Sequence, residues 1–195
     1  MSPRNDRRRI IWDLDDTLND LMAGWLAFWN TSSGSAVSHG ELTQNPPHEL
    51  LGISKADYLL SLDEFRNSPA GRHLKPAPAI LEWFRKHGHD FDHHVITARP
   101  AATVPVAAEW VFSHFGQWIR HFHFVPAVRE SCQVPDMGVA KAVVIDRIGG
   151  GDYFVDDDPL NLETAKPFVG QVLLVSQSWN NGNMSLDELL NLIRG

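Results

Sequence analysis

The stretch "RRRIIWDLDDTLND", residues 7–20, places three carboxylates directly after a short apolar run. The run predicts a buried first strand over Arg9 to Trp12, and Asp13, Asp15 and Asp16 follow it. An unpaired carboxylate inside a protein costs several kcal/mol and usually escapes that cost by becoming neutral. These acids therefore lie at a wet strand end or meet a cation. Side chains alternate along a strand, so Asp13 and Asp15 point the same way if the extended conformation continues to Asp15.

Short apolar runs alternate with helical patterns along the rest of the chain, which is typical of α/β proteins with a parallel sheet. Helices are expected over residues 77–88, 104–116 and 185–195, and the last opens with a capping box of Ser185 and Glu188. The predicted fold is a doubly wound, Rossmann-like parallel sheet. Its further strands are expected at His94 to Ile96, Phe122 to Val125, Tyr153 to Val155 and Val172 to Val175.

The interval between the first two strands is long and carries two helical patterns of its own. They are "NDLMAGWLAFWN", residues 19–30, and "SKADYLLSLDEFRNS", residues 54–68, which begins at a plausible N-cap, Ser54. The loop between them is polar and rich in turn residues. We therefore expect two parts: an α/β core formed by residues 1–18 and 76–195, and a small helical cap inserted at residues 19–75.

A second acidic cluster, Asp156, Asp157 and Asp158, follows the fourth predicted strand in "YFVDDDPLN", residues 153–161. Both clusters come at carboxyl ends of strands, the edge where open parallel sheets bind ligands. Carboxylates aimed at one spot need a shared proton or a cation between them. A hard divalent ion such as Mg²⁺, which prefers oxygen ligands, would suit this arrangement.

Two further segments supply groups that suit a phosphate. "VITARP", residues 95–100, ends a strand with Thr97 and Arg99, and "MGVAKAVVI", residues 137–145, carries Lys141 in a helical stretch. An Asp pair, a hydroxyl, a Lys and an acidic pair in this order resemble the haloacid dehalogenase (HAD) superfamily of phosphotransferases. The resemblance spans about residues 9 to 175, while the cap matches only in position and rough size.

The resemblance implies a Mg²⁺-dependent phosphomonoester hydrolase with an aspartyl-phosphate intermediate. Asp13 would be the nucleophile and Asp15 the general acid and base. The metal would be held by Asp13, by the backbone carbonyl of Asp15, directly by Asp157, and through water by Asp156.

The phosphate-binding residues implied by the resemblance are Thr97 with nearby backbone amides such as that of Ala98, together with Arg99 and Lys141. Lys141 would offset charge between nucleophile and phosphate. The stretches "GRHLKPAPAILEWFRKHG", residues 71–88, and "GGGDYFVDDDPLN", residues 149–161, look most like the 5'-nucleotidase or 5'(3')-deoxyribonucleotidase branch. The expected partner is a small phosphorylated substrate.

Other interpretations stay open. The substrate could be a sugar phosphate or a phosphorylated acid instead of a nucleotide, or the chain could be a non-catalytic HAD-fold binding protein. A metal-dependent glycosyltransferase also uses a D-x-D motif but normally needs a nucleotide-binding half before it, and only 12 residues precede Asp13. Taken alone, Thr97 could cap a strand, Asp16 could form a turn, Asp158 could start a helix and Arg99 could form an ordinary ion pair.

The composition is that of a soluble globular protein, with 43% hydrophobic and 21% charged residues. The net charge of -7 argues against a stable, sequence-independent nucleic-acid complex. No apolar run approaches the roughly 18 to 20 residues of a membrane helix, so we expect a cytoplasmic protein without a membrane partner. The single cysteine, Cys132, excludes an intramolecular disulfide and is interpreted as structural. The oligomeric state is not predicted.

Two side-chain groups have competing interpretations. The histidine-rich stretch "HGHDFDHH", residues 87–94, suggests a transition-metal site, but its spacing matches no familiar closed site, so a solvated helix-to-strand loop is favoured. Trp25, Phe28 and Trp29 in the insertion could stack on a nucleobase, although two of the three are expected to form the core of the cap itself.

Overall fold

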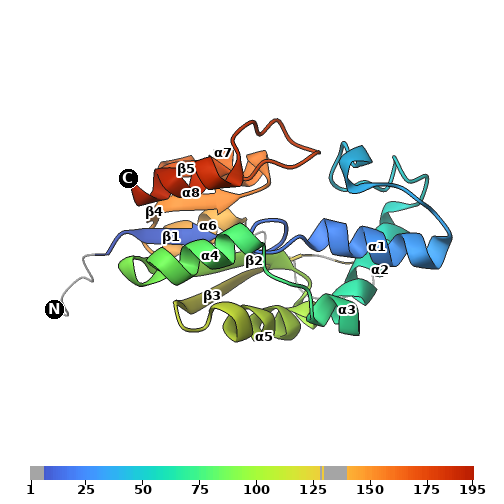
Figure 1. The fold of residues 1–195 in the computed structure, drawn as a ribbon, viewed down its shortest axis with the longest axis horizontal. Coiled ribbons are helices and arrows are strands. Elements are labelled where there is room, and N and C mark those ends of the chain that lie inside the picture. Colours follow the sequence, from blue (N-terminus) through green and yellow to red (C-terminus); the bar gives the residue numbers. More distant parts are fainter. Residues whose placement is uncertain (1–6, 128, 130–139) are drawn as a thin grey trace.

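The first strand lies in the middle of a five-stranded parallel sheet of order β3-β2-β1-β4-β5. The computed structural model describes residues 7–127, 129 and 140–195, so Cys132 lies outside the described residues. The predicted doubly wound α/β fold is confirmed (Figure 1). The strands are β1 (Arg9–Trp12), β2 (Asp92–Arg99), β3 (Ile119–Pro126), β4 (Gly151–Asp156) and β5 (Val169–Leu174).

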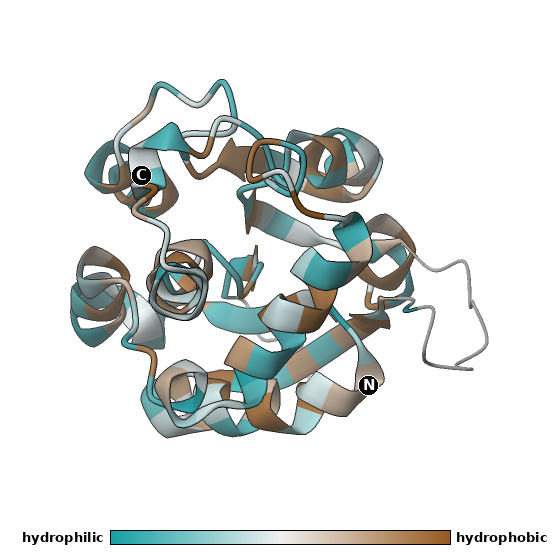
Figure 2. Ribbon diagram, turned by 90° about the vertical axis from the view of Figure 1, so that its right-hand side faces the viewer, coloured by the Kyte–Doolittle hydropathy of each residue, from teal (hydrophilic) through white to brown (hydrophobic). Residues whose placement is uncertain are grey.

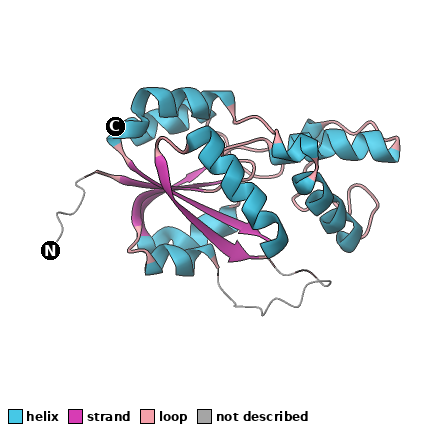
Figure 3. Ribbon diagram, turned by 90° about the horizontal axis from the view of Figure 1, so that it is seen from below, coloured by secondary structure: helices cyan, strands magenta, loops and turns pink. Residues whose placement is uncertain are grey.

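Helices cover both faces of the sheet (Figure 3). On one face Ile10 and Trp12 pack against α4 (Pro78–His87), α5 (Val104–Phe115) and α8 (Leu186–Arg194). On the other face Ile11 packs against α6 (Lys141–Arg147) and α7 (Pro159–Ala165). Successive β1 residues are buried on opposite faces, which is why the strand reads as a continuous apolar run. Short 3₁₀ turns complete the core: η2 (Gly88–Asp90), η3 (Ala101–Thr103) and η4 (Lys166–Phe168).

The surrounding helices are amphipathic. In α8, Leu189, Leu190 and Ile193 are buried while the intervening polar residues are exposed, and Ser185 with Glu188 forms the predicted capping box. Figure 2 shows both brown and teal residues on these helices, as expected of helices with one buried face. No helix in the described part of the chain combines the length and the apolar character needed to cross a membrane.

The residues between β1 and α4 form a separate group of helices beyond the carboxyl ends of the strands, at the right of Figure 1. They are α1 (Leu21–Ser33), η1 (His39–Glu41), α2 (Lys55–Asn67) and α3 (Pro69–Arg72), and they share a hydrophobic cluster of their own that includes Trp25 and Phe65. The two chain segments that connect this group to the sheet lie side by side, and Asn19 and Pro76 form an antiparallel bridge between them. We call residues 19–75 the helical insertion.

One prediction about an element is wrong. The stretch at residues 87–94 is not a solvated loop, because β2 already begins at Asp92 and buries both His93 and His94. His93 accepts from the Trp12 indole through Nδ1 at 3.1 Å, and its Nε2 lies 2.9 Å from the Gly88 carbonyl oxygen. Tertiary burial against the sheet outweighs the polar character that suggested a loop.

Candidate active site

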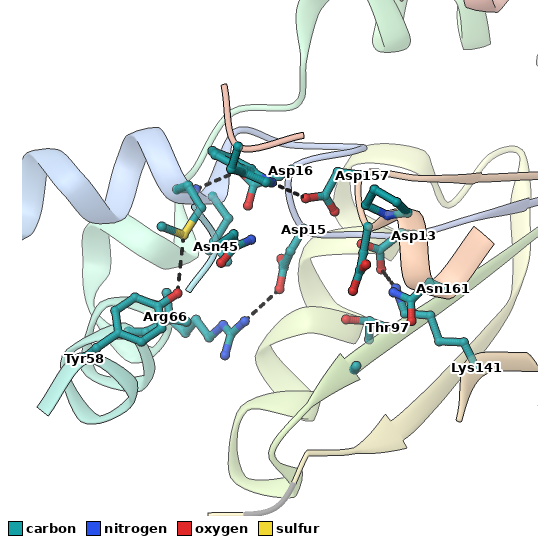
Figure 4. Close-up of a pocket in the computed structure, with 17 residues that line it drawn as sticks. Asp13, Asp15, Asp16, Asn45, Tyr58, Arg66, Thr97, Lys141, Asp157 and Asn161 are labelled. Atoms are coloured by element: carbon teal, nitrogen blue, oxygen red, sulfur yellow. Dashed lines mark hydrogen bonds and ion pairs between the residues drawn. The ribbon is translucent and has the colours of Figure 1, made fainter. Parts of the chain in front are cut away.

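A cavity of about 260 Å³ lies between the carboxyl edge of the sheet and the helical insertion (Figure 4). Its wall contains residues of both acidic clusters and five side chains from the insertion helices. The structure therefore brings together residues that the sequence separates by more than a hundred positions. Of the predicted site residues, those that line the cavity are Asp13, Asp15, Thr97, Ala98, Lys141 and Asp157.

Asp13 is held in place by the sheet. Its backbone N–H donates to the Val155 carbonyl at 2.8 Å, which extends the pairing of β1 with β4 by one residue. The chain then turns: Asp16 has a φ of 57°, a left-handed conformation that Asp tolerates better than most residues. The extended conformation ends before Asp15, so strand alternation does not align Asp13 with Asp15. Asp16 forms this turn, and its Oδ1 accepts from the Met22 N–H at 2.8 Å.

Lys141, the first residue of α6, lies between two carboxylates. Its Nζ is 2.7 Å from Asp13 Oδ1 and 2.7 Å from Asp156 Oδ2, and all three side chains are buried. Burial, with the charges of Asp156 and Asp157, raises the pKa of Asp13 well above its ordinary value, although Lys141 opposes the shift. Burial favours the neutral amine, but the two carboxylates raise the pKa of Lys141 above its usual range. Lys141 is therefore a fixed positive charge.

Asp156 and Asp157 occupy different positions. Asp156 is fully buried behind the wall, where it also accepts from the Asp158 N–H at 2.8 Å and from the Asn161 amide. Asp157 lines the cavity and accepts from the Trp179 indole at 3.0 Å. Burial, followed by the charge of Asp156, raises the pKa of Asp157 to about 7. Asp158 is the N-cap of α7, which confirms the alternative prediction that it starts a helix.

The chemistry of these donors fits a hard dication. One carboxylate oxygen from each of Asp13, Asp156 and Asp157 lies within 4.8 Å of the others, and the three side chains are buried. With all three carboxyl groups ionised, the single ammonium of Lys141 would leave two negative charges to be neutralised. Mg²⁺ prefers all-oxygen ligands and usually retains water, so this set suits it. The side chain of Asp15 is not in the group.

Asp15 lies between the acidic group around Asp13 and Arg66 of the insertion (Figure 4). Arg99 binds both of its oxygens, with Nε 2.8 Å from Oδ2, and Arg66 of α2 lies 2.9 Å from Oδ2. Burial would raise the pKa of Asp15, but Arg99 and then Arg66 lower it to about 2. Asp15 is therefore a carboxylate in this conformation. Arg99 is buried behind Asp15 and does not line the main cavity.

Five polar or aromatic residues of the cavity wall escaped the sequence reasoning: Asn45, Tyr58, Arg66, Asn161 and Trp179. Tyr58 and Arg66 lie on one face of α2, with Leu62 between them, and a buried arginine on an apolar helix face was the signal to follow. Asn161 was present in the quoted acidic stretch, four residues after Asp157, on α7. Trp179 lies in the loop after β5, where no local pattern distinguishes it.

The aromatic residues singled out in α1 do not reach the cavity. Trp25 is fully buried, donates to Ser61 Oγ at 3.1 Å and packs against Trp29 and Tyr58. Phe28 and Trp29 pack on the same cluster. The nucleobase-stacking role considered for α1 therefore has no support, and the aromatic side chains that do line the cavity are Tyr58 and Trp179.

Several solved structures share this fold. A haloacid dehalogenase-like hydrolase from Streptococcus pneumoniae has a TM-score of 0.59 and 16% identity over 95% of this chain and 90% of its own. YfnB, a HAD-hydrolase from Bacillus subtilis bound to magnesium, has a TM-score of 0.60 and 13% identity, covering 96% of this chain and 99% of its own. Protein Tyrosine Kinase A from Mycobacterium tuberculosis has a TM-score of 0.59 and 13% identity, covering 97% and 99%.

These similarities establish the fold that the sequence resemblance implied. The neighbours carry the names of both hydrolases and a kinase, so the fold alone does not fix the reaction. No protein-family model matches the sequence, and no curated protein is significantly similar to it. The function must therefore be argued from the site.

Proposed function

We propose that this protein is a Mg²⁺-dependent phosphomonoester hydrolase with Asp13 as its nucleophile. One observation supports the proposal most strongly. Asp13 is 5% exposed, lines the cavity, lies 2.7 Å from Lys141 Nζ and belongs to the group of three carboxylates. A reactive carboxylate beside a fixed cation and a dication site is what phosphoryl transfer requires. In this proposal the insertion, residues 19–75, is a cap over the substrate, and residues 1–18 and 76–195 are the core.

The first step uses the residues on the sheet side. An oxygen of Asp13 forms a bond to phosphorus while the bond from phosphorus to the ester oxygen breaks, giving an aspartyl phosphate. Lys141 favours the ionised form of Asp13 and offsets the charge of the phosphoryl group. The Thr97 hydroxyl and the Ala98 backbone amide, both on the cavity wall at the end of β2, bind the phosphoryl oxygens.

The metal ligands in this proposal are those that the resemblance implies. Asp13 and Asp157 line the cavity and would bind the ion directly, together with the backbone carbonyl of Asp15. Asp156, already held by Lys141 and Asn161, would act through water. Bound Mg²⁺ supplies charge stabilisation for the transferred phosphoryl group.

Asp15 completes the reaction in this proposal. Its carboxyl group gives a proton to the leaving oxygen, and its carboxylate then takes a proton from the water that attacks phosphorus and releases Asp13. A group with a pKa of about 2 does not hold that proton at neutral pH. Loss of either arginine contact would raise the pKa of Asp15, and Arg66 belongs to the insertion, so we expect movement of the insertion to favour proton transfer.

The substrate is a small phosphorylated metabolite, and two classes are candidates. A 5'-nucleotide or deoxyribonucleotide would place its base against Trp179 and Tyr58 on the cavity wall. A sugar phosphate or phosphorylated acid with a second anionic group is favoured by Arg66, a guanidinium on the same wall. Comparing kcat/KM for nucleoside monophosphates, sugar phosphates and phosphorylated acids separates the two.

The test of the reaction uses an aryl phosphate with and without Mg²⁺. Turnover should vanish with chelator and return with Mg²⁺, and rapid-quench mass spectrometry should find a phosphoryl group on Asp13. Asp13→Asn should abolish both turnover and the phosphorylated form of the enzyme, because an amide cannot form the mixed anhydride. The exposed Asp146→Asn on the same helix as Lys141 is the matched control and should behave as wild type. Full activity in chelator, or a phosphoryl group on Asp13→Asn, would overturn the proposal.

A further inference from the structure

A second group of metal-ligating side chains lies at the other end of β2, away from the cavity. Asp92 and His94 are two residues apart on β2 and therefore share a face of the sheet. The neighbouring strand β3 places His121 in register with His94, and His123 follows on the same face. α6 covers the later part of this face, where Ile96 and Val125 pack against it. Among the residues that the structure describes, no helix covers His121, and its side chain is exposed.

The distances in this group match a metal site. The ligand atoms of Asp92, His94 and His121 all lie within 4.8 Å of one another. His94 Nε2 is 3.4 Å from Asp92 Oδ2, and the rings of His94 and His121 are stacked with centroids 4.2 Å apart. Two atoms that each bind a tetrahedral Zn²⁺ at 2.0–2.1 Å are separated by about 3.3 Å. Asp92 and His94 already have that spacing.

His94 supplies an independent observation. The residue is 5% exposed, and its Nε2 has no hydrogen-bond partner among the residues that the structure describes. A buried ring nitrogen without a partner costs free energy, and this one faces a carboxylate. The other ring nitrogen, Nδ1, lies 3.0 Å from His123 Nε2. A hydrogen bond on the far nitrogen is how proteins fix the orientation of a metal-binding histidine.

Asp92 supplies the negative charge of the group, and its Oδ2 also accepts from Arg9 Nε at 3.0 Å. Burial, and then the neighbouring His121, lower the pKa of His94 to about 4, so the imidazole is the neutral form that binds metals. Asp92 is a carboxylate, because the hydrogen bond from Arg9 keeps its pKa below the ordinary value despite partial burial. Arg9 also donates to the carbonyls of Ile148 and Gly150, which hold its guanidinium on the side of β4.

We propose that Asp92, His94 and His121 bind a divalent transition-metal ion of the Zn²⁺ class, with His123 as a positioning residue for His94. Two imidazoles and one carboxylate favour Zn²⁺, Co²⁺ or Ni²⁺, whereas the all-oxygen group at the cavity suits Mg²⁺. The bound ion joins the edge strand β3 to β2. The site is independent of the proposed function, because none of its residues lines the cavity.

The test titrates protein that carries no histidine tag with Zn²⁺ in saturating Mg²⁺, using isothermal titration calorimetry, and repeats the titration with Co²⁺ to record its absorption bands. Wild type should bind one Zn²⁺ and show the intense visible bands of tetrahedral Co²⁺. His121→Ala changes an exposed side chain and should weaken Zn²⁺ binding by at least 100-fold, while His123→Ala should weaken it by about 10- to 100-fold. His114→Ala, a histidine of α5 outside the group, is the matched control and should bind as wild type.

Asp157→Asn separates this site from the cavity. Zn²⁺ binding that disappears in Asp157→Asn would belong to the acidic group at the cavity and would overturn the proposal. Unchanged binding in His121→Ala would also overturn it. As a second readout, Zn²⁺ should raise the Tm of wild type, His114→Ala and Asp157→Asn but not of His121→Ala, and an equal rise in all four would contradict the site.

Discussion

The two sides of the cavity place carboxylates that are two residues apart in opposite electrostatic environments. On the sheet side, Asp13 shares one Lys141 with the neighbouring Asp156, and burial raises the pKa of Asp13 well above its ordinary value. On the insertion side, Asp15 lies between Arg99 and Arg66, and its pKa falls to about 2. The sheet side has excess negative charge, whereas the charge of Asp15 is balanced by Arg66 of the insertion and Arg99 of β2.

This difference separates two tasks that the sequence assigned to one motif. In the proposed function a dication on the sheet side would relieve the repulsion around Asp13 and leave it ionised, as a nucleophile must be. Nothing comparable is needed around Asp15, which the arginines already stabilise as a carboxylate. Enzymes often hold two acids of a site at different pKa values so that each has its own role. Here the role of Asp15 depends on whether the insertion keeps Arg66 against it.

The largest effect expected on the insertion side comes from Asp15→Asn. The variant keeps the nucleophile but cannot move a proton, so turnover of an alkyl phosphate should fall by about 10² to 10⁴. The loss should be smaller for p-nitrophenyl phosphate, because its leaving group departs without protonation. Steady-state kinetics on both substrates measures the difference.

The phosphoryl enzyme provides the control for this comparison. With the aryl phosphate, Asp15→Asn should accumulate phosphorylated Asp13, since activation of water is then the slow step. Equal losses on both substrates without accumulation would remove the acid and base role from Asp15 and leave it as an anchor for the two arginines.

Local sequence patterns predicted one side of the cavity better than the other. Asp13, Asp157 and Thr97 follow predicted strands, and parallel strands bring their carboxyl ends to one edge, so strand order in the sequence was enough to group them. Arg66 and Trp179 depend on how the insertion and the loop after β5 pack, which periodicity does not encode.

The histidine group shows the same limit in the core. His87, His89, His93 and His94 are close in sequence, but alternation along β2 sends His93 to the opposite face from His94. The partners of His94 come from β3, and only the register between the two strands reveals them. The sequence therefore drew attention to His94 but not to the β3 side chains that lie beside it.

The second prediction concerns Arg99→Gln and stability. The pKa of Asp15 is about 2 in the fold and about 3.9 in an unfolded chain, so the pairing stabilises the protein above about pH 4 and this contribution is lost as the pH falls toward 2. That shift corresponds to an effect on the order of 2 to 3 kcal/mol. Removing the Arg99 guanidinium should lower the free energy of unfolding by about 2 to 3 kcal/mol at pH 7, measured by urea denaturation.

The pH dependence is the decisive part of that measurement. The difference in unfolding free energy between wild type and Arg99→Gln should narrow between about pH 4 and pH 3, where Asp15 of the variant is already protonated. Arg85→Gln, an exposed arginine on α4, should change the unfolding free energy by less than about 0.5 kcal/mol at either pH. A loss that is the same at pH 7 and pH 3 would show that Arg99 stabilises through packing and not through the charge of Asp15.

The smallest effect is expected on the sheet side, from Trp179→Phe. The indole of Trp179 donates to Asp157 Oδ2 at 3.0 Å and lowers the pKa of Asp157, against the larger effect of burial that raises it. Phenylalanine keeps an aromatic ring but removes the donor, so the pKa of Asp157 should rise. A proton then competes more strongly with Mg²⁺ for the Asp157 carboxylate. A hydrogen bond to a charged group contributes about 1.5 kcal/mol or more, so the Mg²⁺ concentration for half-maximal activity should rise by about 10-fold at pH 7. The rise should shrink at pH 8.5, where Asp157 is ionised in both proteins. If half-maximal Mg²⁺ is unchanged while KM rises, Trp179 contacts the substrate and the carboxylate group does not depend on the loop after β5.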